Sequence, residues 1–362
     1  MTPAERERLT EVVQANCDIA DARSAAEMTL CVYLLQMREF YRWARGLPFE
    51  AVLARAEVGE WIAARERRWA EVEDRPFAAL PLPGGGEADP FDVAAVDAAV
   101  RPAGLVYGAG RLGPGRALFF LAEAHGRSER DGLPVVVAGR ELARGLLAPP
   151  AVLQGAGAAA QIVVRRDALA RWGFEKYEAF TLRRQPGSAF AEVARAWAFE
   201  TQGFSAALPG WLDEQQETMV LHEIGEHRVG ERLGPDWAAM REQLPTRRGD
   251  LAARALRDQL ADLGTTLPAL LERGASAALH FWFANYEGLR AQLFPGLQDA
   301  YRHWVRGDGG RALRAACALG TAHFEAAAAR ALERHRAGGA GAGAAVEAFL
   351  TGPEVRCEAP PA

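Results

Sequence analysis

The hydrophobic pattern changes type between about residues 105 and 164. Four apolar runs of strand length lie in this segment, at 105–107, 117–122, 134–137 and 161–164, and glycine-rich turns separate them. The second and third runs predict a hairpin with a charged tip at 127–131, and a short helix is expected at 140–147. Because parallel pairing needs long crossovers, strands this close together predict a small antiparallel sheet.

Helical patterns flank this segment on both sides. Asn16 or Asp18 could cap a first helix that ends near Trp43, and a second helix is expected from about 49 to 69. After about residue 188 the expected helices are 190–201, 211–232, 248–263, 275–293, 296–306 and 311–336. The fold class predicted from this order is α+β and predominantly helical, with the small sheet between N-terminal helices and a C-terminal helical bundle.

Proline and glycine clusters suggest where the chain divides. A loop is expected at 81–90 and a Gly/Ala break at 338–345. We therefore divide the chain into an N-terminal helical region (1–80), a small antiparallel α+β region (81–187), a C-terminal helical bundle (188–350) and a flexible tail (351–362).

The N-terminal helices combine apolar and charged positions. Residues 28–37 are apolar on nearly all sides of a helix, which predicts that this stretch is buried. Four carboxylates surround it, and a buried carboxylate needs a partner or a shifted pKa. Nearby arginines could supply the partners. The carboxylates are Asp18, Asp21, Glu27 and Glu39, and the arginines are Arg23, Arg38 and Arg42.

Composition excludes several classes of protein. Hydrophobic residues make up 49% and charged residues 25% of the 362, as in an ordinary globular protein, and the net charge of −5 gives no reason to expect nucleic acid as a partner. Neither a secretory signal nor an apolar run of about 18–20 residues is present, so no membrane partner is expected. Four scattered cysteines without CxxC spacing predict free thiols in a reducing compartment, a bacterial cytoplasm.

A glycine pattern at residues 108–113 matches the GxGxxG dinucleotide fingerprint. That fingerprint requires a helix to begin at the glycines, where its N-terminus meets the pyrophosphate. Pro114 and Gly115 follow instead, and then another strand-like run, which leaves no room for a crossover helix. We interpret the motif as a turn.

The strongest candidate for chemistry is the run His-Glu-Ile-Gly-Glu-His at residues 222–227. At about 100° per residue on a helix, His222 and Glu226 fall about 40° apart, as do Glu223 and His227. All four side chains occupy an arc of about 140° and could converge on one ion or a pair of ions. The run predicts a divalent metal site for iron, zinc or manganese.

Two other interpretations of this run compete with a metal site. It is not a zincin motif, because the second histidine would have to stand where Glu226 does. A solvated helix face with ordinary i,i+4 pairs would show the same residues. Gly225, inside the helix, favours a metal site over a solvated face. A glycine there can permit close helix packing that brings polar groups into an interface.

Further ligands would have to come from other helices. Asp258 and Asp262 are four residues apart on the expected helix 248–263, although Arg254 and Arg257 beside them favour structural ion pairs. His280 lies on a stripe of small residues that could pack against the helix of His222, and a core histidine with its hydrogen bonds satisfied is the simpler interpretation.

Several segments resemble an uncharacterised bacterial protein family. They are Asn-Cys-Asp-Ile-Ala-Asp-Ala-Arg at 16–23, Leu-Gln-Met-Arg-Glu-Phe-Tyr-Arg-Trp at 35–43, Ala-Gly-Arg-Glu-Leu at 138–142, Leu-His-Glu-Ile-Gly-Glu at 221–226 and Leu-Phe-Pro at 293–295. The resemblance spans most of the chain and implies no particular activity.

Two functional hypotheses follow. In the first, the protein is a metal-dependent enzyme, hydrolytic or oxidative, that acts on a small molecule. His222 and Glu226 are then the primary ligands, Glu223 and His227 are ligands, orienting groups or acid/base groups, and His280, Asp258 and Asp262 are reserve ligands. In the second, it is a non-catalytic helical protein that binds a partner or forms a homo-oligomer. An enzyme should hold the 222–227 face in a pocket, whereas a partner-binding protein should expose an apolar patch elsewhere.

Overall fold

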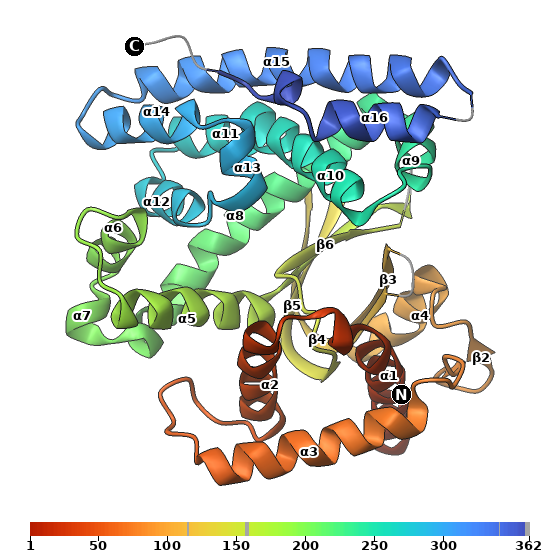
Figure 1. Cartoon of the computed structure of the whole chain (residues 1–362). Coiled ribbons are helices and arrows are strands. Elements are labelled where there is room, and N and C mark those ends of the chain that lie inside the picture. Colours follow the sequence, from red (N-terminus) through yellow and green to blue (C-terminus); the bar gives the residue numbers. More distant parts are fainter. Residues whose placement is uncertain (114–115, 156–158, 340, 359–362) are drawn as a thin grey trace. The chain divides into compact units, whose positions relative to one another are not determined.

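The computed structural model describes residues 1–113, 116–155, 159–339 and 341–358 (Figure 1). These residues fold into two compact units. Unit 1 consists of Met1–Lys176 and Phe204–Leu212, and unit 2 of Tyr177–Gly203 and Asp213–Ala362. The predicted class, α+β and mostly helical with a small sheet between N-terminal and C-terminal helices, is confirmed. Unit 1 combines the predicted N-terminal helices with the predicted sheet region.

Unit 1 is built on a five-stranded sheet with the strand order β3-β4-β5-β7-β6. Its strands are β3 (Leu105–Gly113), β4 (Arg116–Arg130), β5 (Leu133–Arg144), β6 (Ala151–Gln154) and β7 (Gln161–Arg165). All neighbours pair antiparallel except β5 and β7, which run parallel from Val135↔Ile162 to Ala138↔Arg165. The sequence predicted antiparallel pairing throughout, but the chain between Ala138 and Ile162 is long enough for a crossover. A separate two-stranded antiparallel sheet joins β1 (Leu80–Pro81) to β2 (Glu87–Ala88).

The hairpin predicted between the second and third runs is present as β4 and β5. Asp131 and Gly132 both have positive φ values, 52° and 78°, as a tight hairpin turn requires. The helix predicted at 140–147 is wrong, since β5 continues to Arg144. The end of β5 pairs with β4 through Leu121↔Ala143, and this pairing overrides the local helical preference.

The glycine motif at 108–113 lies within β3, so its interpretation as a turn is wrong. Gly108 is required by packing, because a Cβ at that position would lie 2.2 Å from the ring of Phe120 on the neighbouring strand β4.

Helices cover this sheet and extend unit 1. They are α1 (Pro3–Ser24), α2 (Leu30–Ala44), α3 (Arg55–Val72), α4 (Val93–Val100) and the start of α5 (Arg166–Leu182). α1 packs on β4 and β5, where Leu9, Val13 and Cys17 join the apolar core. Its N-cap is Thr2, which forms a capping box with Glu5. The helix predicted from Asn16 or Asp18 to Trp43 is wrong, because both residues are buried inside α1 and the chain to Trp43 is divided between α1 and α2.

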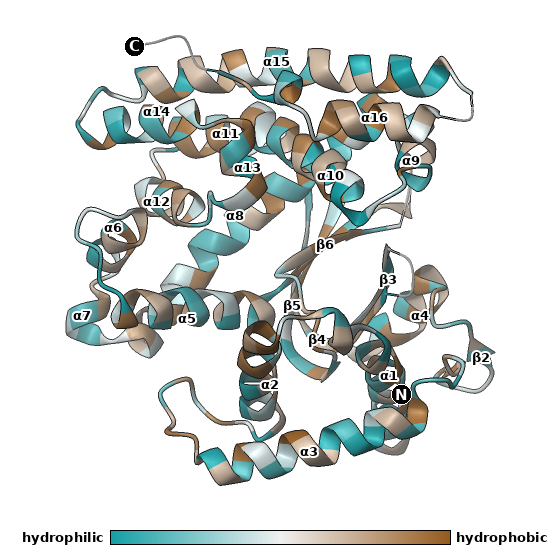
Figure 2. Ribbon diagram, in the orientation of Figure 1, coloured by the Kyte–Doolittle hydropathy of each residue, from teal (hydrophilic) through white to brown (hydrophobic). Residues whose placement is uncertain are grey.

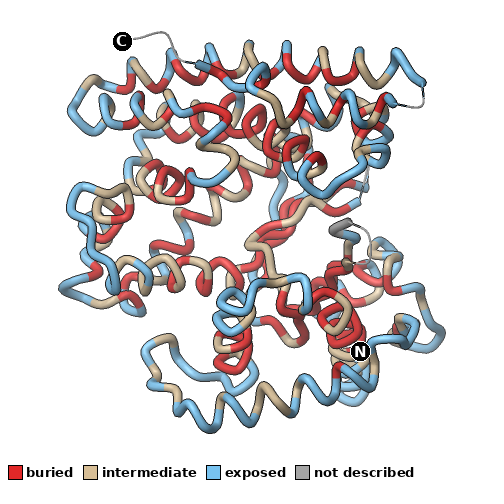
Figure 3. Tube along the Cα trace, in the orientation of Figure 1, coloured by how far each residue is buried: buried red, intermediate tan, exposed pale blue. Residues whose placement is uncertain are grey.

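The burial predicted for residues 28–37 is wrong for most of that stretch. Leu30, Val32, Leu34 and Leu35 of α2 are 70%, 48%, 47% and 50% exposed. Figure 2 colours this part of α2 as hydrophobic, and much of the same stretch is exposed in Figure 3. Met37 and Phe40, further along α2, are fully buried against α3. An apolar helix therefore does not have to be a core helix.

Unit 2 is a bundle of helices. Its elements are the rest of α5, α6 (Ala189–Ala196), α7 (Phe199–Gln202), most of α8 (Phe204–Leu233), α9 (Pro235–Glu242), α10 (Arg247–Ala261), α11 (Leu267–Glu272), α12 (Ser276–Ala284), α13 (Gly288–Leu293), α14 (Gly296–Val305), α15 (Arg311–Arg336) and α16 (Ala342–Leu350). Its core includes Leu256, Phe294, Leu313 and Phe324. The long helix α15 packs against α10, α14 and α16 (Figure 1). No helix in the described ranges is long and apolar enough to cross a membrane.

Two departures from the predicted helices affect the site described below. The predicted helix 275–293 is divided into α12 and α13. The helix that begins as α10 passes at Asp262–Thr266 into one π-helical turn before α11 begins. Pro268 explains this change, because it has no N–H to donate to the carbonyl four residues earlier.

Candidate functional site

A close approach of α8 and α10 positions the predicted metal site in unit 2. At Gly225 the two helices come so close that a Cβ would lie 2.7 Å from the carbonyl oxygen of Ala261. The role expected for this glycine, close helix packing that brings polar groups into an interface, is confirmed. His222, three residues before Gly225, and Glu226, directly after it, therefore lie close to α10.

Three potential ligands meet at this interface. His222 and Glu226 of α8 and Asp258 of α10 each place one ligand atom within 4.8 Å of the other two. Two atoms bound to one ion at about 2.1 Å lie about 3–4 Å apart, so the spacing is close to that of a metal site. The pair His222 Nε2 and Glu226 Oε1 is 3.6 Å apart. Both side chains are mostly buried, with 24% and 15% exposed.

Asp262 orients the imidazole. Its Oδ1 lies 2.8 Å from Nδ1 of His222, and its Oδ2 accepts a hydrogen bond of 2.9 Å from Nη1 of Arg290. The Asp262 side chain is completely buried and opens the π-helical turn. Because Nδ1 donates to a carboxylate, Nε2 is the nitrogen that faces Glu226, and this carboxylate–histidine arrangement is typical of metal sites.

The cluster has an excess of acidic groups. The carboxyl groups of Glu223, Glu226 and Asp258 affect one another's pKa. Asp262 adds a fourth carboxyl beside His222, and the cations facing the four are Arg257, Arg290 and His222. Burial and the Glu226 carboxylate raise the pKa of Glu223 and of Asp258 to about 7. For His222, burial acts to lower the pKa, but the Asp262 carboxylate outweighs it, and the pKa lies well above the usual value.

The remaining predicted site residues differ in their distance from this cluster. Glu223 is buried and close enough to share its electrostatics. His227 faces Glu231, with Nε2 3.6 Å from Oε1. His280 lies on α12, which packs against α6, and its Nδ1 is 2.8 Å from the hydroxyl of Tyr301. Neither His227 nor His280 belongs to the group of ligand atoms found among the described residues.

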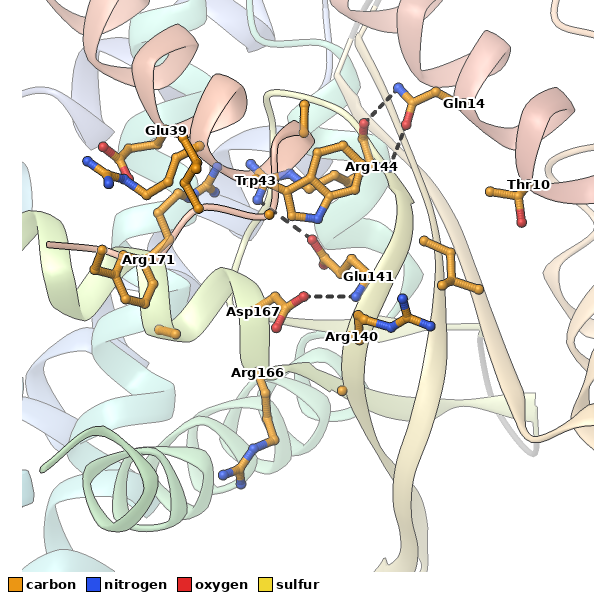
Figure 4. A pocket seen from close by; sticks show the side chains of 18 of the residues that line it. Thr10, Gln14, Glu39, Trp43, Arg140, Glu141, Arg144, Arg166, Asp167 and Arg171 are labelled. Atoms are coloured by element: carbon orange, nitrogen blue, oxygen red, sulfur yellow. Dashed lines mark hydrogen bonds and ion pairs between the residues drawn. The ribbon is translucent and has the colours of Figure 1, made fainter. Parts of the chain in front are cut away.

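Unit 1 contains a pocket that the sequence did not reveal. Its volume is about 1120 Å³, and its walls come from α1, α2, α3, β4, β5, α5 and the start of α8. Figure 4 shows Glu39 and Trp43 of α2, Glu141 and Arg144 of β5, and Arg171 of α5 in the wall. Gln14 of α1 supports the wall, since its side chain bonds both the backbone N–H and the carbonyl of Arg144, at 3.1 and 3.0 Å.

The pocket wall contains buried ion pairs. Glu39 pairs with Arg38 and Arg42, as expected for its position, and Glu141 pairs with Arg165 through a 2.6 Å hydrogen bond. Several guanidinium nitrogens in this wall nevertheless make no hydrogen bond to a described residue: Nη2 of Arg144, Nε and Nη1 of Arg171, and Nε of Arg65. Each such buried donor costs about 1–3 kcal/mol.

The sequence carried only a weak signal of this pocket. An Arg-Glu pair followed by a further arginine occurs in both 38–45 and 139–144, but these two segments, which meet at the pocket, lie far apart in the sequence. With no fixed spacing between them, no motif could have revealed the pocket.

Two family models match the chain. They are the N-terminal domain of a family of unknown function, DUF6866, over residues 8–165 and the C-terminal domain of the same family over residues 170–352. The chain belongs to this family. The DUF6866 models divide the chain near the start of α5, close to the first boundary between the two units. No curated protein and no solved structure matches the chain.

Proposed function

We propose that this protein is a metal-dependent enzyme whose ion is held by His222, Glu226 and Asp258. The observation that carries the proposal is the carboxylate of Asp262 on Nδ1 of His222, which directs Nε2 toward the Glu226 and Asp258 oxygens. One imidazole and two carboxylates suit Zn²⁺, Mn²⁺ or Fe²⁺.

The net charge of the residues around His222 also supports a divalent cation. Four carboxyl groups in this cluster face two guanidinium groups and one imidazole, so a divalent cation bound to neutral His222 balances their charge. The ion would replace the proton on Nε2, and its uptake would release that proton to the solvent.

Three protein ligands leave coordination positions for water and substrate. A metal ion in such a site acts as a Lewis acid and lowers the pKa of a bound water. Glu223, a buried carboxyl beside the ligands, is placed to accept that proton. This combination favours hydrolysis of a small molecule over oxidation. We place the reaction in a reducing compartment, the cytoplasm, because the four cysteines are free thiols.

The test compares two histidines on the same helix. The affinity of the full-length protein for Zn²⁺ and Mn²⁺ is measured by competition with a chromophoric chelator, for the wild type, His222→Gln and His227→Gln. We expect His222→Gln to weaken binding at least about tenfold and His227→Gln to leave it unchanged. The proposal is contradicted if the wild type binds neither ion. It is also contradicted if His222→Gln and His227→Gln weaken binding equally.

A second candidate function is partner binding or homo-oligomer formation. The exposed apolar residues of α2, Leu30, Val32, Leu34 and Leu35, favour it. Sedimentation of the wild type and of Leu34→Glu separates the candidates: a dimer that becomes a monomer in the variant supports this function, and a monomeric wild type removes the homo-oligomer.

A further inference from the structure

We infer that the pocket of unit 1 binds a small organic anion, a molecule with a carboxylate or phosphate group attached to an apolar body. The inference is independent of the metal site, because all residues that line the pocket belong to unit 1.

The sign of the charge in the pocket supports an anion. Seven arginines and four acidic residues line it. Several of the acidic groups are already engaged within the wall: Glu39 pairs with Arg42, Glu141 pairs with Arg165, and Asp167 accepts the backbone N–H of Glu141 at 2.8 Å. The residues that line the pocket therefore carry more positive than negative formal charge.

Arginines on three separate elements supply the binding groups. Arg144 on β5 and Arg171 on α5 are only 1% and 7% exposed, and both have guanidinium nitrogens without a hydrogen-bond partner among the described residues. Arg65 on α3 is the third arginine with such a nitrogen, its Nε. These donors are fixed by the fold and line one pocket, as a site for an oxyanion requires.

The carboxylates nearest to Arg144 and Arg171 in their ion pairs lie beyond hydrogen-bond distance. Nη1 of Arg144 lies 3.7 Å from Oε2 of Glu141, and Nε of Arg171 lies 3.8 Å from Oε1 of Glu175, and both distances are too long for a hydrogen bond. Oε2 of Glu141 is itself buried without a hydrogen-bond partner. Residues that line the pocket therefore carry buried arginine N–H groups whose hydrogen-bonding capacity is unused in the described structure.

The size and the other walls of the pocket indicate what the anion is attached to. A volume of about 1120 Å³ is far larger than one phosphate or carboxylate group needs. Trp43, Leu47, Phe49 and Leu142 form apolar parts of the wall. The guanidinium carbon of Arg144 lies 5.4 Å from the Trp43 ring, so the cationic and aromatic groups are adjacent. An anion with an apolar body contacts both.

Calorimetry with three probes tests the inference. Full-length protein is titrated at constant ionic strength with inorganic phosphate, phenyl phosphate and benzoate. We expect at least one of the two aromatic probes to bind about tenfold more tightly than inorganic phosphate, because only they reach the apolar wall. If phenyl phosphate alone binds, the natural anion is a phosphate, and if benzoate alone binds, it is a carboxylate.

Variants locate the binding. Arg171→Gln and Arg144→Gln should each weaken the tighter probe about tenfold, while Arg302→Gln, an exposed arginine paired with Asp299 in unit 2, should not. Circular dichroism reports whether Arg144→Gln folds, and if it does not, Arg171→Gln decides. The inference is overturned if no probe binds at millimolar concentration, if inorganic phosphate binds as tightly as both aromatic probes, or if affinity is unchanged in Arg171→Gln.

Discussion

The carboxylate of Asp262 fixes the orientation of the His222 imidazole through a contact with Nδ1. An imidazole on a helix surface presents two equivalent nitrogens, and it becomes a directed ligand only when one of them is fixed. Asp262 fixes Nδ1 from a completely buried position, and Arg290 holds Asp262 in turn. Removing the charge of Asp262 therefore changes the site without touching a proposed ligand.

We predict that Asp262→Asn weakens Zn²⁺ or Mn²⁺ binding about 10- to 100-fold, because the neutral amide no longer increases the basicity of His222. The measurement is chelator competition on the purified variant. Asp299→Asn is the matched control, since Asp299 is exposed and paired with Arg302 on α14. Equal affinity in the wild type and Asp262→Asn would show that the carboxylate does not act on a metal ligand.

A second prediction at the residue scale concerns Asp167 and pH. Burial and the Glu141 carboxylate raise its pKa from an ordinary value of 3.8 to about 6. In the folded protein the charged form is disfavoured, so its penalty is absent below about pH 4, grows between pH 4 and 6, and is complete above pH 6. Asp167→Asn removes the charge and keeps an oxygen for the Glu141 N–H.

Asp167→Asn should therefore be more stable than the wild type by about 1–3 kcal/mol at pH 7.5 and equally stable near pH 4. Urea unfolding at both pH values measures the difference. A stabilisation of the same size at both pH values would mean that burial of the charge is not its cause.

At the scale of elements, the sequence predicted what depends on local pattern. The helices expected at 296–306 and 311–336 agree with α14 and α15, and the β4–β5 hairpin was predicted from its two neighbouring apolar runs. Tertiary contacts decided the rest. The segment 140–147 had helical residues but pairs as a strand, and residues 28–37 had the pattern of a core helix but are largely exposed.

Half of the candidate metal site could be predicted in the same way. The spacing of His222 and Glu226 on one helix is a local property, and it brought them to the same face. Whether Asp258 or His280 is the third potential ligand depends on which helix packs against α8. The hydrophobic periodicity of the sequence does not reveal that packing. Asp262 stands at the start of a π-helical turn that the sequence pattern did not predict.

Two glycines of α8 provide a prediction about helix packing. Gly225→Ala gains about 1 kcal/mol of helix propensity but places a Cβ 2.7 Å from the Ala261 carbonyl, so we expect a net loss of about 1–2 kcal/mol in unfolding free energy. Gly230→Ala meets no atom within 4 Å and should be neutral or stabilising by up to about 1 kcal/mol. Chemical unfolding of both variants measures the contrast. A stable Gly225→Ala variant would mean that α8 and α10 can separate without cost.

At the scale of the whole molecule, the two candidate sites belong to different units. The arginine-lined pocket is built entirely from unit 1 and the His222 cluster entirely from unit 2. A ligand that binds only the native state stabilises the segments that hold it. Each ligand should therefore leave its own pattern of protection along the chain.

Hydrogen exchange followed by mass spectrometry measures this pattern. Saturating Zn²⁺ or Mn²⁺ should slow exchange in the second half of α8 and in α10, because the ion links His222 and Glu226 to Asp258 across two helices. Peptides from β4 and β5 serve as the control, since they contribute no ligand atom to that group, and their exchange should stay constant. Protection that spreads equally over both units would mean that the metal stabilises the protein without a specific site, whereas protection confined to α12, which contains His280, would move the site to that histidine.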